Sequence, residues 1–97
     1  MYLIFSVPSD KRSKTDEILR DDIVSRQSII IRDCTALGLK DLGLLILIEG
    51  DDAAVKRAQE LLKDLAKALE GGQASDVYQR FKNEADQVGS GVGLIFG

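Results

Sequence analysis

Three short apolar runs in the first half of the chain are typical of β-strands. Residues 2–7 read YLIFSV and end at Pro8, and residues 28–33 read SIIIRD. Residues 44–50 read LLILIEG, with no polar position before Glu49. β-Branched and aromatic residues favour strands, and an uninterrupted apolar run indicates a strand that is buried on both faces. The pattern therefore predicts strands over these three ranges, with the third buried on both sides.

Apolar residues at helical spacing predict two helices that alternate with these strands. A short stripe predicts a helix over 14–25, where Ser13 and Asp16 have the spacing of a capping box. A longer series of alanines and leucines predicts a helix over 52–70, which Gly71-Gly72 would end. The second helix has the more regular pattern, so its leucines are expected in the core.

The rest of the chain predicts a further helix over 75–88 and a fourth strand over 91–96, GVGLIF. The order of elements is then β-α-β-β-α-(α)-β. Apart from the extra helix, this order resembles the βαββαβ pattern of ferredoxin-like domains. The resemblance lies in element order alone. It implies a single α+β domain over 1–97, a ferredoxin-like sandwich in which a four-stranded antiparallel sheet carries helices on one face.

The two strands expected at the centre of this sheet are apolar on both faces. In the first strand, Leu3 and Phe5 point to one side and Ile4 to the other. A sheet face without helices would then expose a large apolar patch, which soluble monomers rarely tolerate. The pattern predicts a homo-oligomer that is joined through the helix-free sheet face. In the alternative, the leucine-rich loop 34–42 or the helix over 75–88 covers this face within one chain.

Composition narrows the possible chemistry. The 97 residues include no histidine, which is the commonest general base near neutral pH and the commonest zinc ligand. The one cysteine, Cys34, cannot form an internal disulfide, and no apolar run is long enough to cross a membrane. A cytoplasmic protein without membrane contact is expected. We expect no metal or cofactor, because the pairs Asp21-Asp22 and Asp51-Asp52 lack the spaced ligands of a calcium loop.

Charge is distributed unevenly along the chain. The net charge of −3 argues against non-specific nucleic-acid binding, but residues 1–40 hold seven basic and six acidic side chains. Several of the basic side chains lie near the expected start of the first helix, where backbone N–H groups and the helix dipole favour an anion. We therefore expect a small anionic ligand in the first half of the chain, and the alternative is an ordinary solvated loop. The candidate anion-binding residues are Lys11, Arg12, Lys14, Arg26 and Arg32.

The glycine-rich segment GSGVG at 89–93 has the composition of a phosphate-binding loop but the wrong context. A dinucleotide fingerprint needs a strand before the glycines and a helix after them, and here the predicted order is reversed. Gly89 and the glycines that follow are interpreted as a helix end and a hinge into the last strand.

These patterns favour a non-enzymatic oligomeric domain that binds a small ligand, or that has a regulatory or scaffolding role. One alternative is an enzyme whose site forms between subunits from Arg, Lys and Asp side chains. Another is RNA binding on the sheet, which needs exposed aromatic residues on the central strands. Only Tyr2 and Phe5 are there, and they point to opposite faces, so the RNA alternative has little support.

Overall fold

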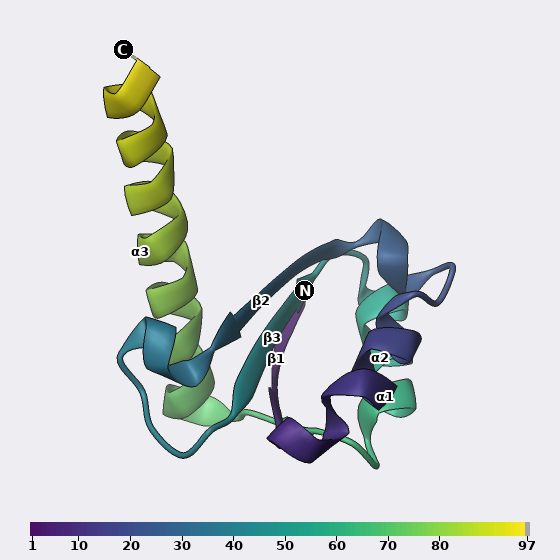
Figure 1. Ribbon diagram of the computed structural model, residues 1–97. Helices are drawn as coiled ribbons and strands as arrows, with labels where there is room; N and C mark the ends of the chain where they lie inside the picture. Colours follow the sequence, from purple (N-terminus) through teal and green to yellow (C-terminus); the bar gives the residue numbers. More distant parts are fainter. Residues whose placement is uncertain (97) are drawn as a thin grey trace.

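The computed structural model describes the backbone of residues 1–96 and the side chains of residues 1–84. It is a small α+β structure in which a four-stranded antiparallel sheet lies between helices (Figure 1). The strands are β1 (Tyr2–Val7), β2 (Ser28–Asp33), β3 (Leu44–Glu49) and β4 (Lys67–Ala68), in the spatial order β2-β3-β1-β4. The α-helices in the described residues are α1 (Arg12–Leu19), α2 (Asp52–Leu62) and α3 (Gly71–Phe96). Short 3-10 turns are η1 (Ser9–Lys11), η2 (Val24–Arg26) and η3 (Cys34–Leu37). None of the described helices is long and apolar enough to span a membrane.

The three long strands form where the apolar runs predict them. β1 and β2 have the predicted bounds, and β3 ends one residue early, at Glu49. β3 pairs with β2 on one side and β1 on the other, and its residues 44–48 are all buried. The uninterrupted apolar run of β3 is therefore explained by its central place between two covered faces.

The first helix is shorter than the predicted range 14–25. α1 ends at Leu19 and is followed by a turn, because the carboxylate of Asp21 accepts the backbone N–H groups of Ile23 and Val24 at 3.1 Å. The expected capping box at Ser13 does not form, since Ser13 already lies inside the helix and the N-cap position is Lys11.

The predicted helix over 52–70 is wrong in its second half. α2 ends at Leu62, where the N–H groups of Leu65 and Ala66 turn back to the Leu62 carbonyl at 2.9 and 2.8 Å. The chain then extends into β4, which pairs with Phe5 and Ser6 of β1. The leucines that continue the helical spacing therefore belong to a turn and a strand end.

The predicted fourth strand over 91–96 is also wrong. Its residues lie in α3, a single helix that takes the place of the expected helix over 75–88 as well. Gly71 begins this helix in the left-handed region, with φ of 59°, where a residue with a side chain would be strained. The expected helix end at Gly89 is not observed either, because the backbone of 89–93 continues the helix.

Helices cover both faces of the sheet, which corrects the expectation of helices on one face. α1 and α2 lie on one side and α3 on the other (Figure 1). The buried residues of the first core, between the sheet and α1 and α2, are Phe5, Val7, Val24, Leu44, Ile46, Ile48, Val55, Ala58 and Leu62. Those of the second core, between the sheet, η3 and α3, are Ile4, Cys34, Leu37, Leu45, Leu47, Leu69, Val77 and Phe81. The alternation of apolar residues along β1 and β3 thus supplies two separate cores.

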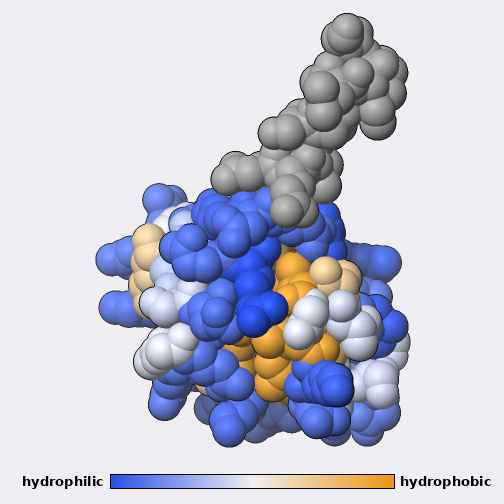
Figure 2. Space-filling model, turned by 90° about the vertical axis from the view of Figure 1, so that its left-hand side faces the viewer, coloured by the Kyte–Doolittle hydropathy of each residue, from blue (hydrophilic) through white to orange (hydrophobic). Residues whose placement is uncertain are grey.

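The second core corresponds to the alternative in which segments of the same chain, and not a second subunit, cover the second face of the sheet. Both expected segments contribute to it, the loop 34–42 through η3 and the following chain, and residues 75–84 through α3. Figure 2 views the molecule from the α3 side and shows that some apolar surface remains between polar side chains there. The covered face no longer gives a reason to place an interface on it, and the oligomeric state stays a prediction.

Candidate functional site

A pocket of about 320 Å³ opens at the β4 edge of the sheet, and three lysines line it. Lys11 comes from η1, Lys63 follows the last residue of α2, and Lys67 lies in β4. Ser6 of β1 and Asp64 are the other polar residues of its wall. The remaining lining residues are Pro8, Leu65 and Ala66.

Backbone turns bring these distant segments together. Pro8 follows the end of β1, and its carbonyl accepts the N–H of Lys11 at 2.9 Å, which closes η1 beside the strand. On the other side, the turn after Leu62 reverses the chain so that Lys67 pairs with Ser6 across the β1–β4 ladder. The pocket is the space between these two turns.

The lysines give this pocket a surplus of positive charge. Lys63 has only a long contact with Glu60, at 3.7 Å between exposed side chains. Among the described side chains, no carboxylate lies within 4.0 Å of the ammonium group of Lys11 or Lys67. Asp64 partly offsets the three ammonium groups. A small anion would be attracted there, with an affinity that falls as salt is added, because the site is open to solvent.

The structure assigns different surroundings to the five predicted anion-binding residues. Lys11 lines the pocket, whereas Arg12 and Lys14 are exposed on α1 and do not line it. Arg26 pairs with Asp22 at 3.3 Å on the surface. Arg32 forms an ion pair with Glu84 of α3, on the opposite side of the sheet from α1. Lys11 is thus the only one of the five in this pocket.

Sequence reasoning missed two of the three lysines. Lys63 and Lys67 lie in the range 52–70, which was predicted as one continuous helix. A helix of that length would place them four residues apart on one exposed face, with no strand beside them. The turn at Lys63 and the strand pairing of Lys67 create the pocket, and neither has a clear signal in the local sequence.

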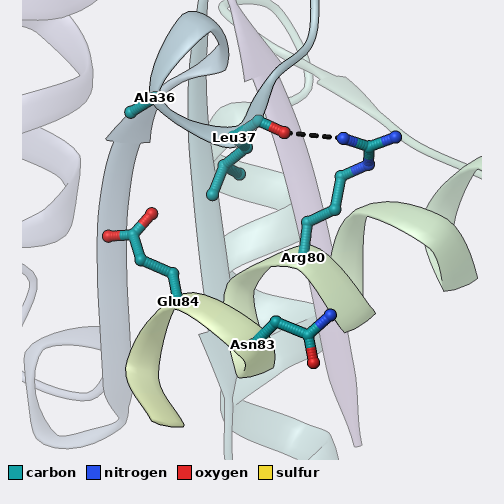
Figure 3. A pocket seen from close by; sticks show the side chains of 5 residues that line it. All are labelled: Ala36, Leu37, Arg80, Asn83 and Glu84. Carbon is teal, nitrogen blue, oxygen red and sulfur yellow. Dashed lines mark hydrogen bonds between the residues drawn. The ribbon is translucent and has the colours of Figure 1, made fainter. Parts of the chain in front are cut away.

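A second pocket, of about 210 Å³, lies between η3 and α3 (Figure 3). It is lined by Ala36, Leu37, Arg80, Asn83 and Glu84. The Arg80 guanidinium donates to the Leu37 carbonyl at 2.7 Å and to the carboxylate of Asp76 at 3.0 Å. Both charged side chains of the wall therefore already have partners within the chain, since Glu84 is paired with Arg32. The bond from Arg80 to Leu37 attaches α3 to η3, and the pair of Glu84 with Arg32 attaches α3 to β2.

A polar network attaches α3 to the sheet as well. The Tyr78 hydroxyl donates to Glu49 at 2.8 Å, the Lys82 ammonium donates to the same carboxylate at 3.2 Å, and the Tyr78 ring stacks on Tyr2 at 4.0 Å between centroids. The hydrogen bond from Tyr78, and then that from Lys82, holds the pKa of Glu49 below its usual value. With Phe5 buried and Tyr2 stacked, both aromatic residues of the central strands are engaged within the chain.

The acidic pairs have structural partners. Asp21 accepts two hydrogen bonds of 2.8 Å from Arg57 of α2 in addition to the two backbone N–H groups. Asp51 is the N-cap residue of α2 but its side chain makes no capping hydrogen bond, and Asp52 lies 3.7 Å from the N-terminal ammonium group. Among residues with described side chains, no cluster of three or more acidic, cysteine or histidine residues is placed to hold a metal ion.

The Asp21–Arg57 pair predicts an acid-dependent contribution to stability. The hydrogen bond from Arg57, followed by that from the N–H of Val24, lowers the pKa of Asp21 far below its usual value. Because the folded pKa is depressed, the contribution is fully present above the unfolded pKa of about 4 and is lost as the pH falls below it. Asp21→Asn should therefore lower the melting temperature at pH 7, and the difference from the native protein should shrink at pH 3.

The exposed neighbour supplies a matched control for this prediction. Asp22 makes only a surface ion pair with Arg26, so Asp22→Asn should change the melting temperature little at either pH. Equal effects of the two substitutions at pH 7 would contradict the role given to Asp21.

Comparison of the chain with protein-family models, with curated proteins and with solved structures gives no match.

Proposed function

We propose that this protein is a non-enzymatic domain that binds a small anion, such as phosphate or a small carboxylate, in the lysine-lined pocket at the β4 edge. The observation that carries the proposal is the meeting of Lys11, Lys63 and Lys67 around one hollow from three separate segments. Lysine ammonium groups are compact charges on flexible stems, so they can close around an anion of small size.

The residues of the pocket favour binding over catalysis. Its wall offers ammonium groups, one hydroxyl and one carboxylate. The hydroxyl of Ser6 donates a short hydrogen bond to the Leu42 carbonyl, and the chain contains no histidine that would activate it as a nucleophile. The three ammonium groups suit a ligand that is bound by charge and released without chemical change.

A thermal-shift titration tests this function. Millimolar phosphate should raise the melting temperature of the native protein, because a ligand that binds the folded state stabilises it. Lys11→Ala, Lys63→Ala and Lys67→Ala should each weaken phosphate binding by roughly twofold to fivefold, the scale of exposed charge pairs, and the triple variant should abolish the shift.

Arg12→Ala and Lys14→Ala are the controls, since both remove a nearby positive charge without touching the pocket. They should leave the shift intact. Loss of the shift in these variants, with retention in Lys63→Ala and Lys67→Ala, would assign the anion to the start of α1. If no small anion raises the melting temperature of the native protein, the proposed site is wrong and the basic residues near the start of α1 belong to an ordinary solvated surface.

We further propose that the architecture is a ferredoxin-like βαββαβ unit extended by α3. The proposal is supported by the strand order β2-β3-β1-β4 and by two helices on one face, α1 after β1 and α2 after β3. In this interpretation the two-residue β4 is the last strand of the unit, and α3 is an addition that covers the other face.

A further inference from the structure

The outer edge of β2 has no partner strand among the described residues. β2 is the terminal strand of the sheet and pairs with β3 alone. It has six residues, with no proline or glycine, and three consecutive isoleucines that are only half-buried. Long apolar edges of this kind tend to pair with another strand, and proteins normally shorten, charge or cover them.

The hydrogen-bonding phase of β2 shows which backbone groups point outward. The N–H of Cys34, directly after the strand, donates to the Gly43 carbonyl at 2.9 Å, which continues the β2–β3 ladder. Backbone groups alternate in direction along an antiparallel strand. The N–H and C=O groups of Ile30 and Arg32 therefore also point to β3, whereas those of Ile29 and Ile31 point away from it. In agreement, the Ile31 carbonyl accepts a hydrogen bond of 2.7 Å from the Arg32 side chain.

We propose that the outer edge of β2 pairs antiparallel with the same edge of a second copy of this chain, so that the two sheets join into one. The two-fold axis passes through Ile30, which faces Ile30 of the partner subunit. Ile29 then lies opposite Ile31 of the partner subunit, and the outward N–H and C=O groups of both residues are paired. Ser28 lies opposite Arg32 of the partner subunit.

The side chains favour this register over its nearest alternative. With Ile30 on the axis, apolar residues face apolar residues and polar residues face polar ones, which is the arrangement that stabilises cross-strand pairs. The next register in the same hydrogen-bonding phase has Ile31 on the axis. It would place Ile30 opposite Arg32 of the partner subunit, and Ile29 opposite Asp33 of the partner subunit. The sequence SIIIR is thus close to self-complementary only about Ile30.

Neighbouring elements can enlarge the interface beyond the strand edge. α1 shares the first core with β2, since Ile18 and Leu19 of α1 and Ile29 and Ile31 of β2 all pack against it. Ile18 and Leu19 of α1 are incompletely buried, and Ile23 is 46% exposed. A stable interface buries about 800 Å² per partner, which is more than a six-residue strand edge supplies. We expect these three side chains to supply the rest of the buried area.

One contact has to change when the edges pair. Arg32 covers the outward carbonyl of Ile31 in the single chain and also forms the ion pair with Glu84. In the dimer, the N–H of Ile29 of the partner subunit replaces the guanidinium on that carbonyl, and Arg32 keeps Glu84. In the single chain, Arg32 therefore satisfies one outward carbonyl of the edge, which the partner subunit satisfies in the dimer.

Sedimentation and amide hydrogen exchange on the full chain test the proposal together. We expect the mass of two chains at micromolar concentrations, with the amides of Ile29 and Ile31 becoming protected as the concentration rises. The amides of Ile30 and Arg32 should be protected at every concentration, because they already face β3. A single-chain mass throughout, or a dimer whose Ile29 and Ile31 amides exchange freely, would overturn the proposal.

Charged substitutions at Ser28, which would lie opposite Arg32 of the partner subunit, test the register. Ser28 is exposed but lies opposite Glu49 of β3, so Ser28→Lys gains an opposite charge within the chain and Ser28→Glu a like one; the melting temperature of each variant is therefore measured beside its dissociation constant. Ser28→Lys opposes Arg32 of the partner subunit and should raise the dimer dissociation constant by roughly threefold to thirtyfold, counting both symmetric pairs, while Ser28→Glu should lower it. The same substitutions at exposed Ser75 of α3 serve as controls and should have no effect. Equal dissociation constants for the Ser28 variants would exclude this register, whether or not the protein binds anions.

Discussion

Replacing Phe81 by alanine should lower the free energy of unfolding by about 3–5 kcal/mol, the usual cost of truncating a buried phenylalanine. Phe81 is 2% exposed and packs in the second core with Ile4, Leu45 and Leu47. The loss would leave a cavity between α3 and the sheet. Urea denaturation that follows backbone and tyrosine signals separately measures the change.

The neighbouring position on the same helix provides the control. Gln79 is exposed, so Gln79→Ala should change the free energy of unfolding by less than about 0.5 kcal/mol. A loss of that small size for Phe81→Ala would mean that α3 does not cover the sheet. The face would then be open, and the interface first expected from the sequence would become the better explanation of its apolar residues.

Leu62→Ala should cost about 2–5 kcal/mol, whereas Leu65→Ala should cost less than half as much as Leu62→Ala. Leu62 is the last residue of α2 and is fully buried in the first core. Leu65 lies in the following turn, is half-buried and lines the lysine pocket. The two substitutions remove the same atoms, so their difference reports mainly the difference in burial. Equal losses would show that Leu65 is as deeply buried as Leu62, which the helix predicted over 52–70 would require.

The strands could be predicted because their signal is local. β1, β2 and β3 are dense apolar runs with residues that favour strands, and their observed bounds agree with the predicted ones to within one residue. β4 could not be predicted, because two residues are too few for a pattern. Lys67 and Ala68 become a strand only because the edge of β1 beside Phe5 and Ser6 accepts them.

The helices were less predictable because apolar spacing alone does not show where a helix stops. Leu65 and Leu69 continue the spacing of α2, yet Leu69 is buried in the second core, on the other face of the sheet from Leu62. The chain must leave the helix to reach that face. In the same way, the residues at 91–96 have the composition of a strand, but the open edge of β1 is already taken by β4.

The candidate site was predictable only in part for the same reason. Lys11 stood out because it lies beside the end of an obvious strand. Lys63 and Lys67 looked like ordinary residues on the exposed side of a helix, and their role depends on a turn and a strand that tertiary pairing creates. Arg26 lies four residues after its partner Asp22, a spacing that sequence reasoning could have noted, whereas Arg32 and its partner Glu84 are 52 residues apart and have no signal in the local sequence.

The pairing of β1 with β3 has a consequence for the chain during its synthesis. β2 and β3 are joined by a short connection, but Leu3 pairs with Ile48, far along the chain. At the usual rates of translation, β1 leaves the ribosome roughly 2–9 s before β3 does. Throughout that interval an apolar strand is exposed without the two cores that will bury it. The nascent chain is therefore most prone to aggregation, and most dependent on chaperones, before β3 emerges.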